Sequence, residues 1–97
     1  MKMEKKKRWR QIKNDKNELA WTTGKMPFKI GDKYTYIEFT PPTKRKIGSL
    51  HIIKHTVNWV DGLASSTKSK DVHQSSPKTR TEGIAMAKRY MKSHPNG

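Results

Sequence analysis

Residues 34–40 read Tyr34-Thr35-Tyr36-Ile37-Glu38-Phe39-Thr40, and Pro41-Pro42 follows directly. β-Branched and aromatic residues favour strands, and prolines end a strand because they lack a donor N–H. Side chains alternate between the two faces of a strand, so Ile37 and Phe39 share one face. The other face carries both tyrosines together with Glu38. The run therefore predicts a strand with one face in the core and one face partly in contact with water.

A second β-rich run spans Ser49–Val60 and is closed by Asp61-Gly62. Alternation places His51 and His55 on one face, with Ile53, Val57 and Trp59, and it places Leu50, Ile52 and Val60 on the other. Apolar residues on both faces are typical of a central strand, or of a strand with a bulge that switches faces.

Shorter strands are expected upstream of these two runs. Arg8–Lys13 and Glu18–Thr22 flank residues 14–17, a cluster of turn-forming residues. Phe28–Ile30 precedes the first run and is joined to it by Gly31-Asp32, where glycine supplies the positive φ of a tight turn. Together these segments predict an antiparallel meander of three to five strands.

Residues 79–93 are expected to form a helix. Thr79 is a suitable N-cap, and Glu82 three residues later completes a capping box. The apolar positions recur at helical spacing and form one stripe, which consists of Ile84, Ala87, Tyr90 and Met91. The predicted fold class is therefore α+β, a small antiparallel β-meander with one C-terminal amphipathic helix packed on one face.

Composition divides the 97 residues into three parts. Residues 1–7 are expected to be a flexible basic arm, because Lys, Met and Glu offer little surface to bury. Residues 8–93 are expected to form a single domain. Within it, the serine-rich stretch 64–78 has one large apolar residue, Val72, and is predicted to be a mobile loop. Residues 94–97 form a tail.

The charge of the chain points to an anionic partner. Lys and Arg number 22 against 8 Asp and Glu, which gives a formal net charge of +14. Solubility alone is usually served by a net charge of roughly 2–8.

The absence of Cys excludes a disulfide scaffold, a thiolate zinc site and a cysteine nucleophile. No apolar run approaches the roughly 18 residues of a membrane helix, so no membrane association is expected. The expected location is the cytoplasm, or the host cytoplasm if the protein is viral.

No residue is assigned to catalysis, to a metal or to a cofactor. His51 and His55 have a spacing that would suit metal ligands on a helix, but on a strand they lie roughly 13 Å apart. The sequence contains neither a G-x-S-x-G motif nor a glycine-rich phosphate loop. The one enzyme class left open is a small basic nuclease that uses Glu38 and a histidine.

Basic clusters supply the candidate binding residues. A flexible arm and a basic loop between strands suit contacts to phosphates, and tyrosines beside them suit stacking on bases. The alternative for the tyrosines is half-buried packing, and Trp9, Trp21 and Trp59 are expected in the core. The expected nucleic-acid-binding residues are Lys5, Lys6, Lys7, Arg8, Arg10, Lys44, Arg45, Lys46, Tyr34, Tyr36, His51, His55, Lys88, Arg89 and Lys92.

In element order, a three-stranded sheet followed by one helix, the chain resembles the arm-type DNA-binding domains of phage integrases. That resemblance implies a sheet laid in the major groove. The helix opening, Thr81-Glu82-Gly83-Ile84-Ala85, is similar to that of many small phage proteins.

Two functions follow from these patterns. The first is a small nucleic-acid-binding protein, for DNA or RNA, that contacts the phosphate backbone through the arm and the basic loop. The alternative is a small phage-type inhibitor that docks on an acidic surface, or in the nucleic-acid channel, of a host enzyme. Both functions use the same positive charge, and the sequence does not set the oligomeric state.

Overall fold

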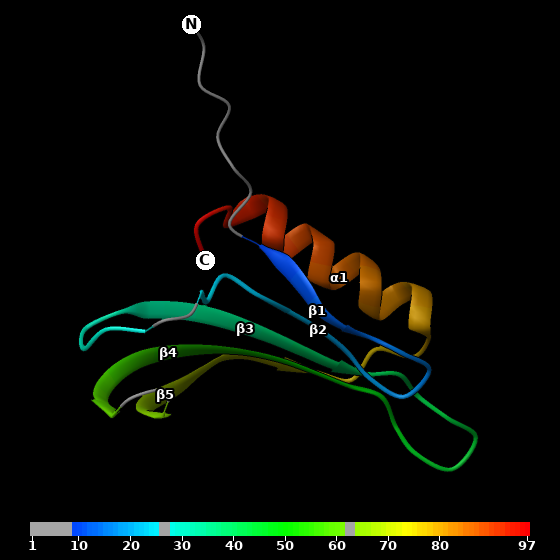
Figure 1. The fold of residues 1–97 in the computed structure, drawn as a ribbon. Helices are drawn as coiled ribbons and strands as arrows, with labels where there is room; N and C mark the ends of the chain where they lie inside the picture. The colour runs from blue at the N-terminus through cyan, green and yellow to red at the C-terminus, as the bar shows by residue number, and fades with distance from the viewer. Residues whose placement is uncertain (1–8, 26–27, 62–63) are drawn as a thin grey trace, which may run out of the picture.

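The computed structural model describes residues 9–25, 28–61 and 64–97. In this part of the chain, five antiparallel strands lie side by side in sequence order and one helix packs on them (Figure 1). The sheet is open, with the first and last strands at its edges. The predicted fold class is confirmed. The elements are β1 (Arg10–Asn14), β2 (Leu19–Thr22), β3 (Lys33–Thr40), β4 (Ser49–Asp61), β5 (Ala64–Ser75) and α1 (Arg80–Ser93).

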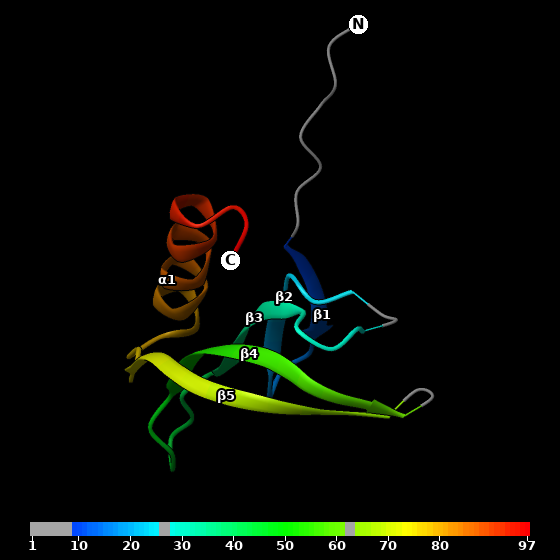
Figure 2. The ribbon, with the colours of Figure 1, turned by 90° about the vertical axis from the view of Figure 1, so that its left-hand side faces the viewer.

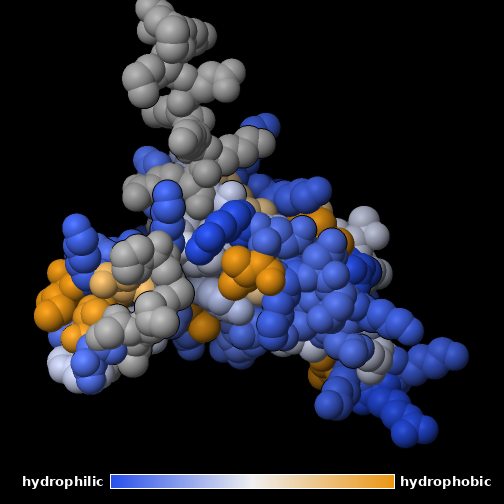
Figure 3. All heavy atoms as spheres, viewed as in Figure 1, coloured by the Kyte–Doolittle hydropathy of each residue, from blue (hydrophilic) through white to orange (hydrophobic). Residues whose placement is uncertain are grey.

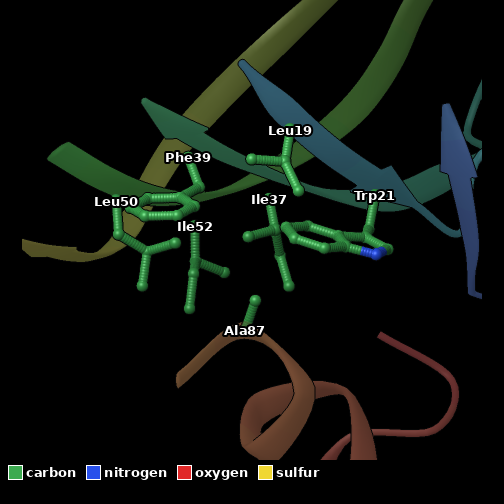
Figure 4. Close-up of a cluster of buried hydrophobic side chains, with 7 residues drawn as sticks. All are labelled: Leu19, Trp21, Ile37, Phe39, Leu50, Ile52 and Ala87. Carbon is green, nitrogen blue, oxygen red and sulfur yellow. The ribbon is translucent and has the colours of Figure 1, made fainter. Parts of the chain in front are cut away.

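The core lies between α1 and the three middle strands. Two rows of side chains cross these strands in register, because Leu19 pairs with Phe39 and Phe39 with Leu50, while Trp21 pairs with Ile37 and Ile37 with Ile52. All six side chains are buried and point toward Ala87 of the helix (Figure 4). The alternation predicted for β3 is therefore confirmed, and it defines a helix-side face and an open face of the sheet.

The helix begins where the capping pattern predicts. The Thr79 Oγ1 accepts a hydrogen bond from the backbone N–H of Glu82 at 3.0 Å. The Glu82 carboxylate reaches back to accept from the N–H of Lys78 at 3.3 Å, one residue upstream of the cap. Gly83 and Ala87 are the buried residues of the helix, so this small-residue stripe sets how closely α1 approaches the sheet.

The first hairpin also follows the sequence prediction. The Asp15 carboxylate accepts hydrogen bonds from the backbone N–H groups of Asn17 and Glu18, both at 2.8 Å. These bonds close the turn between β1 and β2 and lower the pKa of Asp15. Lys13 and Glu18 form a salt bridge at 2.7 Å next to this turn.

The prediction of a mobile loop over residues 64–78 is wrong for residues 64–75. Residues 64–75 form β5, which pairs with β4 from Ala64 to Ser75. The register shifts twice, once between Ile52 and Ile53 and once between Val57 and Trp59. A polar edge strand without an apolar stripe has the composition of a loop, and its order comes from backbone pairing with β4 rather than from buried side chains.

Two smaller predictions also fail. Phe28–Ile30 is not a strand, because Asp32 N–H bonds to the Lys29 carbonyl at 3.0 Å and closes a turn. Gly31 in that turn has a φ of 93°, the positive value that the sequence predicts for a glycine in a tight turn. Trp59 is 52% exposed rather than in the core. It follows the second register shift, in the part of the β4–β5 hairpin that extends away from α1 (Figure 2). Trp21 is buried, and Trp9 packs partly buried against the core.

Candidate nucleic-acid interface

Four lysines gather on the helix-side face of the sheet, beyond the area that α1 covers. We call them the lysine patch, which consists of Lys33 on β3, Lys54 on β4, and Lys68 and Lys70 on β5. All four are exposed, and they line one hollow of about 520 Å³. None was among the binding residues that the sequence predicted.

The register of the three strands sets the geometry of the patch. Lys54 lies directly opposite Lys70, and Thr56 lies between Lys33 and Lys68 in the next row. Directly opposite side chains have Cβ atoms about 5 Å apart. One row across the three strands therefore reads Lys33, Thr56 and Lys68, and the next reads Thr35, Lys54 and Lys70. No register shift falls within this part of the sheet.

The border of the patch toward α1 is formed by Thr35 and the tail after the helix. Thr35 is buried and donates from Oγ1 to the Gly97 carbonyl oxygen at 3.1 Å. Asn96 and Gly97 line the hollow beside the lysines. The tail thus lies on the boundary between the apolar area that α1 covers and the lysine patch.

Two carboxylates of these strands, Glu38 and Asp71, lie on the opposite face. Glu38 is paired in register with His51, and Asp71 with Ile53, and both partners belong to the open face. Among the described residues the only salt bridge is Lys13–Glu18, in which Glu18 raises the pKa of Lys13. Within that part of the chain, the patch lysines therefore form no salt bridge.

The basic loop between β3 and β4, with Lys44, Arg45 and Lys46, lies at the other end of the sheet. The Thr43 Oγ1 accepts from the N–H groups of Arg45 and Lys46 at 3.2 and 3.0 Å, and the Thr43 N–H donates to the Lys46 carbonyl at 2.9 Å. The three cationic side chains are exposed and project as a hydrophilic corner at the lower right of Figure 3. The loop is thus held in shape by its own backbone.

The cations predicted on the helix divide between its two sides. Lys88 and Lys92 line a hollow together with Arg10 of β1, whose guanidinium donates to the Gly24 carbonyl. Arg89 lines a different hollow, on the β4–β5 side of the helix. The structure therefore brings Arg10, Lys88 and Lys92 together and separates Arg89 from them. Lys5, Lys6, Lys7 and Arg8 lie outside the described residues.

The predicted aromatic candidates lie on the open face as a packed cluster. Tyr34 stacks on Phe28 with ring centroids 4.9 Å apart and on His55 at 4.8 Å, so both of its faces are covered. Tyr36 meets His55 edge to face at 6.5 Å. Burial raises the pKa of both tyrosines and lowers the pKa of His55. A base could stack on Tyr34 only after a neighbouring ring moved away. His51 is half-buried opposite Glu38.

In the described ranges, no group of three or more His, Asp or Glu side chains is placed to hold a metal ion. Within those ranges the one helix, α1, is too short and too polar to cross a bilayer.

No protein-family model, curated protein or solved structure matches the chain. The lysine patch had one signal in the sequence, the period-two alternation Thr67-Lys68-Ser69-Lys70, which is typical of a strand with one basic face.

Proposed function

We propose that this protein binds nucleic acid through contacts to the phosphate backbone, with the lysine patch as its principal contact surface. The observation that carries the proposal is the pairing of Lys54 directly opposite Lys70. Like charges at directly opposite positions destabilise a sheet. An anion bound between the two ammonium groups removes that repulsion and gives the arrangement a function.

The extent of the patch favours a polyanion over a single small anion. Lys33 and Lys68 are two strand spacings apart, roughly 9.6 Å, and Lys68 and Lys70 are roughly 6.6 Å apart along β5. Cations spread in this way suit a chain of repeated phosphates, and each neutralised phosphate releases condensed counterions. The net charge of +14 adds a long-range attraction of the same sign. The basic loop and residues 5–8 are proposed as further contacts.

The test compares the salt dependence of binding for matched variants. Fluorescent duplex and single-stranded oligonucleotides are titrated with the wild type and with Lys54→Glu/Lys70→Glu. If both lysines contact phosphates, the slope of log K against log salt becomes shallower by about 1.8 on duplex, at roughly 0.9 per phosphate. The affinity falls in the same experiment.

A control variant separates a defined surface from general charge. Lys16→Glu/Lys25→Glu makes the same change in net charge at exposed positions that line neither the lysine patch nor the hollow beside the basic loop, and it should leave the slope nearly unchanged. Equal losses for the two double variants would show that the patch has no special role. Absence of binding by the wild type at about 50 mM salt would refute nucleic-acid binding itself. Lys44→Glu/Lys46→Glu tests the basic loop in the same assay.

A further inference from the structure

A second surface combines cations with apolar side chains. A groove of about 710 Å³ runs between β1, β2 and α1. We call it the tryptophan groove. Its apolar lining consists of Trp9, Trp21, Met91 and Pro95, and its cationic rim consists of Arg10, Lys88 and Lys92. No residue of the lysine patch lines it.

The groove is held in shape by bonds between the start of the described chain and its end. The Trp9 indole N–H donates to the His94 carbonyl at 2.7 Å. The Trp9 ring meets Tyr90 edge to face at 6.2 Å, and Tyr90 stacks on His94 at 4.0 Å. A site fixed before binding loses less conformational entropy when a ligand enters.

We infer that the tryptophan groove binds an acidic segment of a partner protein that also carries apolar side chains. The argument is charge complementarity. Three cations surround the apolar lining, so carboxylates suit the rim while apolar side chains fill the groove. Residues 1–8 hold five Lys and Arg against one Glu, and a second copy carries the same net charge of +14. Both of these candidate occupants are positively charged, like the rim, and would be repelled by it. An acidic partner has the opposite charge and would be attracted.

The apolar lining also argues against nucleic acid as the occupant. A base binds by stacking on an exposed aromatic face. Trp21 is only 6% exposed, and Trp9 is packed against Tyr90. Met91 and Pro95 offer no aromatic face. Phosphates would contact the rim and leave the apolar lining in water, while the apolar face of an amphipathic helix would cover it.

The experiment uses an acidic amphipathic peptide as a probe. A peptide of about 18 residues carries leucines at helical spacing and glutamates elsewhere, and a second peptide replaces the leucines by serines. Binding is followed by the indole N–H resonances of the ¹⁵N-labelled full chain. The leucine peptide should shift the signals of Trp9 and Trp21 and leave that of Trp59, which lies outside the groove, unchanged. The serine peptide should bind much more weakly.

Matched helix variants assign the contact to one side of α1. Lys88→Glu should weaken binding of the leucine peptide about fivefold or more. Arg89→Glu should not, because Arg89 lines the hollow on the β4–β5 side of the helix. The same comparison can be made for the apolar lining. Met91→Ser, which changes the tryptophan groove, should weaken binding more than Met86→Ser, which changes the hollow on the other side of α1.

Four outcomes overturn the inference. They are absence of peptide binding up to about 1 mM, equal binding of the serine peptide, equal effects of Lys88→Glu and Arg89→Glu, and shifts at Trp9 and Trp21 caused by a single-stranded oligonucleotide instead. Since the Lys54→Glu/Lys70→Glu variant leaves this groove intact, failure here is distinguishable from failure of the proposed nucleic-acid binding.

Discussion

The ring of Phe39 occupies the space in which a side chain at Gly83 would lie. A Cβ atom at position 83 would overlap three carbon atoms of that ring. Phe39 is fully buried in the middle strand of the sheet, and Gly83 faces it from the first turns of α1. The helix reaches the sheet this closely because position 83 has no side chain.

Gly83→Ala should therefore destabilise the protein. Alanine in a helix gains about 1 kcal/mol over glycine, but overpacking a well-packed core costs typically 1–3 kcal/mol. We expect a net loss, measured as a lower free energy of unfolding in urea. Ala85→Gly at an exposed position of the same helix provides the propensity effect alone. Addition of Phe39→Leu to Gly83→Ala should recover part of the loss, and a lack of coupling between the two positions would contradict this account.

The parts of the fold that sequence reasoning predicted are those that local chemistry specifies. The alternation in β3 requires one buried face, and the Thr79–Glu82 pair specifies where α1 begins. The turn at Asp15 follows from a side chain that bonds to its neighbouring backbone. Each of these signals lies within a few residues of the chain.

The parts that sequence reasoning missed depend on register between distant segments. β5 is polar along most of its length, so its composition resembles that of a loop. It is ordered because its backbone pairs with β4. In a loop, Lys68 and Lys70 would have no defined neighbours. The lysine patch joins three segments that are separated in sequence, and only the pairing of Lys54 with Lys70 brings it together. The size of Trp59 predicts a core position, but Trp59 follows a register shift in β4 and is exposed.

Tyr90→Phe should leave the protein as stable as the wild type, or make it more stable. In the described part of the chain the Tyr90 hydroxyl is buried and has no hydrogen-bond partner, and burial raises its pKa. A buried, unpaired hydroxyl costs about 1–3 kcal/mol, and phenylalanine keeps the ring contacts with Trp9 and His94. Thermal unfolding measures the effect. Tyr90→Leu, which removes the aromatic contacts, should lower the unfolding temperature. A clear loss of stability in Tyr90→Phe would reveal a partner for the hydroxyl.

His55 should make the stability of the protein depend on pH. Burial between Tyr34 and its other neighbours lowers the pKa of His55 from its ordinary value of 6.5. The unfolded state then binds a proton more readily than the folded state. The stability contributed by neutral His55 is therefore fully present above about pH 6.5. It is lost as the pH falls from 6.5 through the lower pKa that His55 has in the folded state. Urea unfolding between about pH 7.5 and pH 5 measures this decline.

The control for this prediction is His55→Gln, which cannot gain a proton in that range but can still bond to Ser69, now 2.9 Å from the imidazole. The decline in stability over the interval should be smaller in the variant than in the wild type. Identical pH profiles would show that another group causes the dependence.

Lys54→Glu should stabilise the folded protein while it weakens binding to nucleic acid. The substitution replaces two like charges at directly opposite positions of β4 and β5 with an ion pair. Cross-strand pairs contribute roughly 0.2–1 kcal/mol, so a gain of that size in the free energy of unfolding is expected at low salt. Because both side chains are exposed, about 1 M salt should remove most of the gain. Lys70→Glu should behave in the same way, and the double variant should lose the gain, since it again places like charges opposite each other. This charge cycle needs no knowledge of the ligand. If Lys54→Glu is no more stable than the wild type at low salt, the two ammonium groups do not repel each other appreciably, and the strongest reason for an anion at the lysine patch is removed.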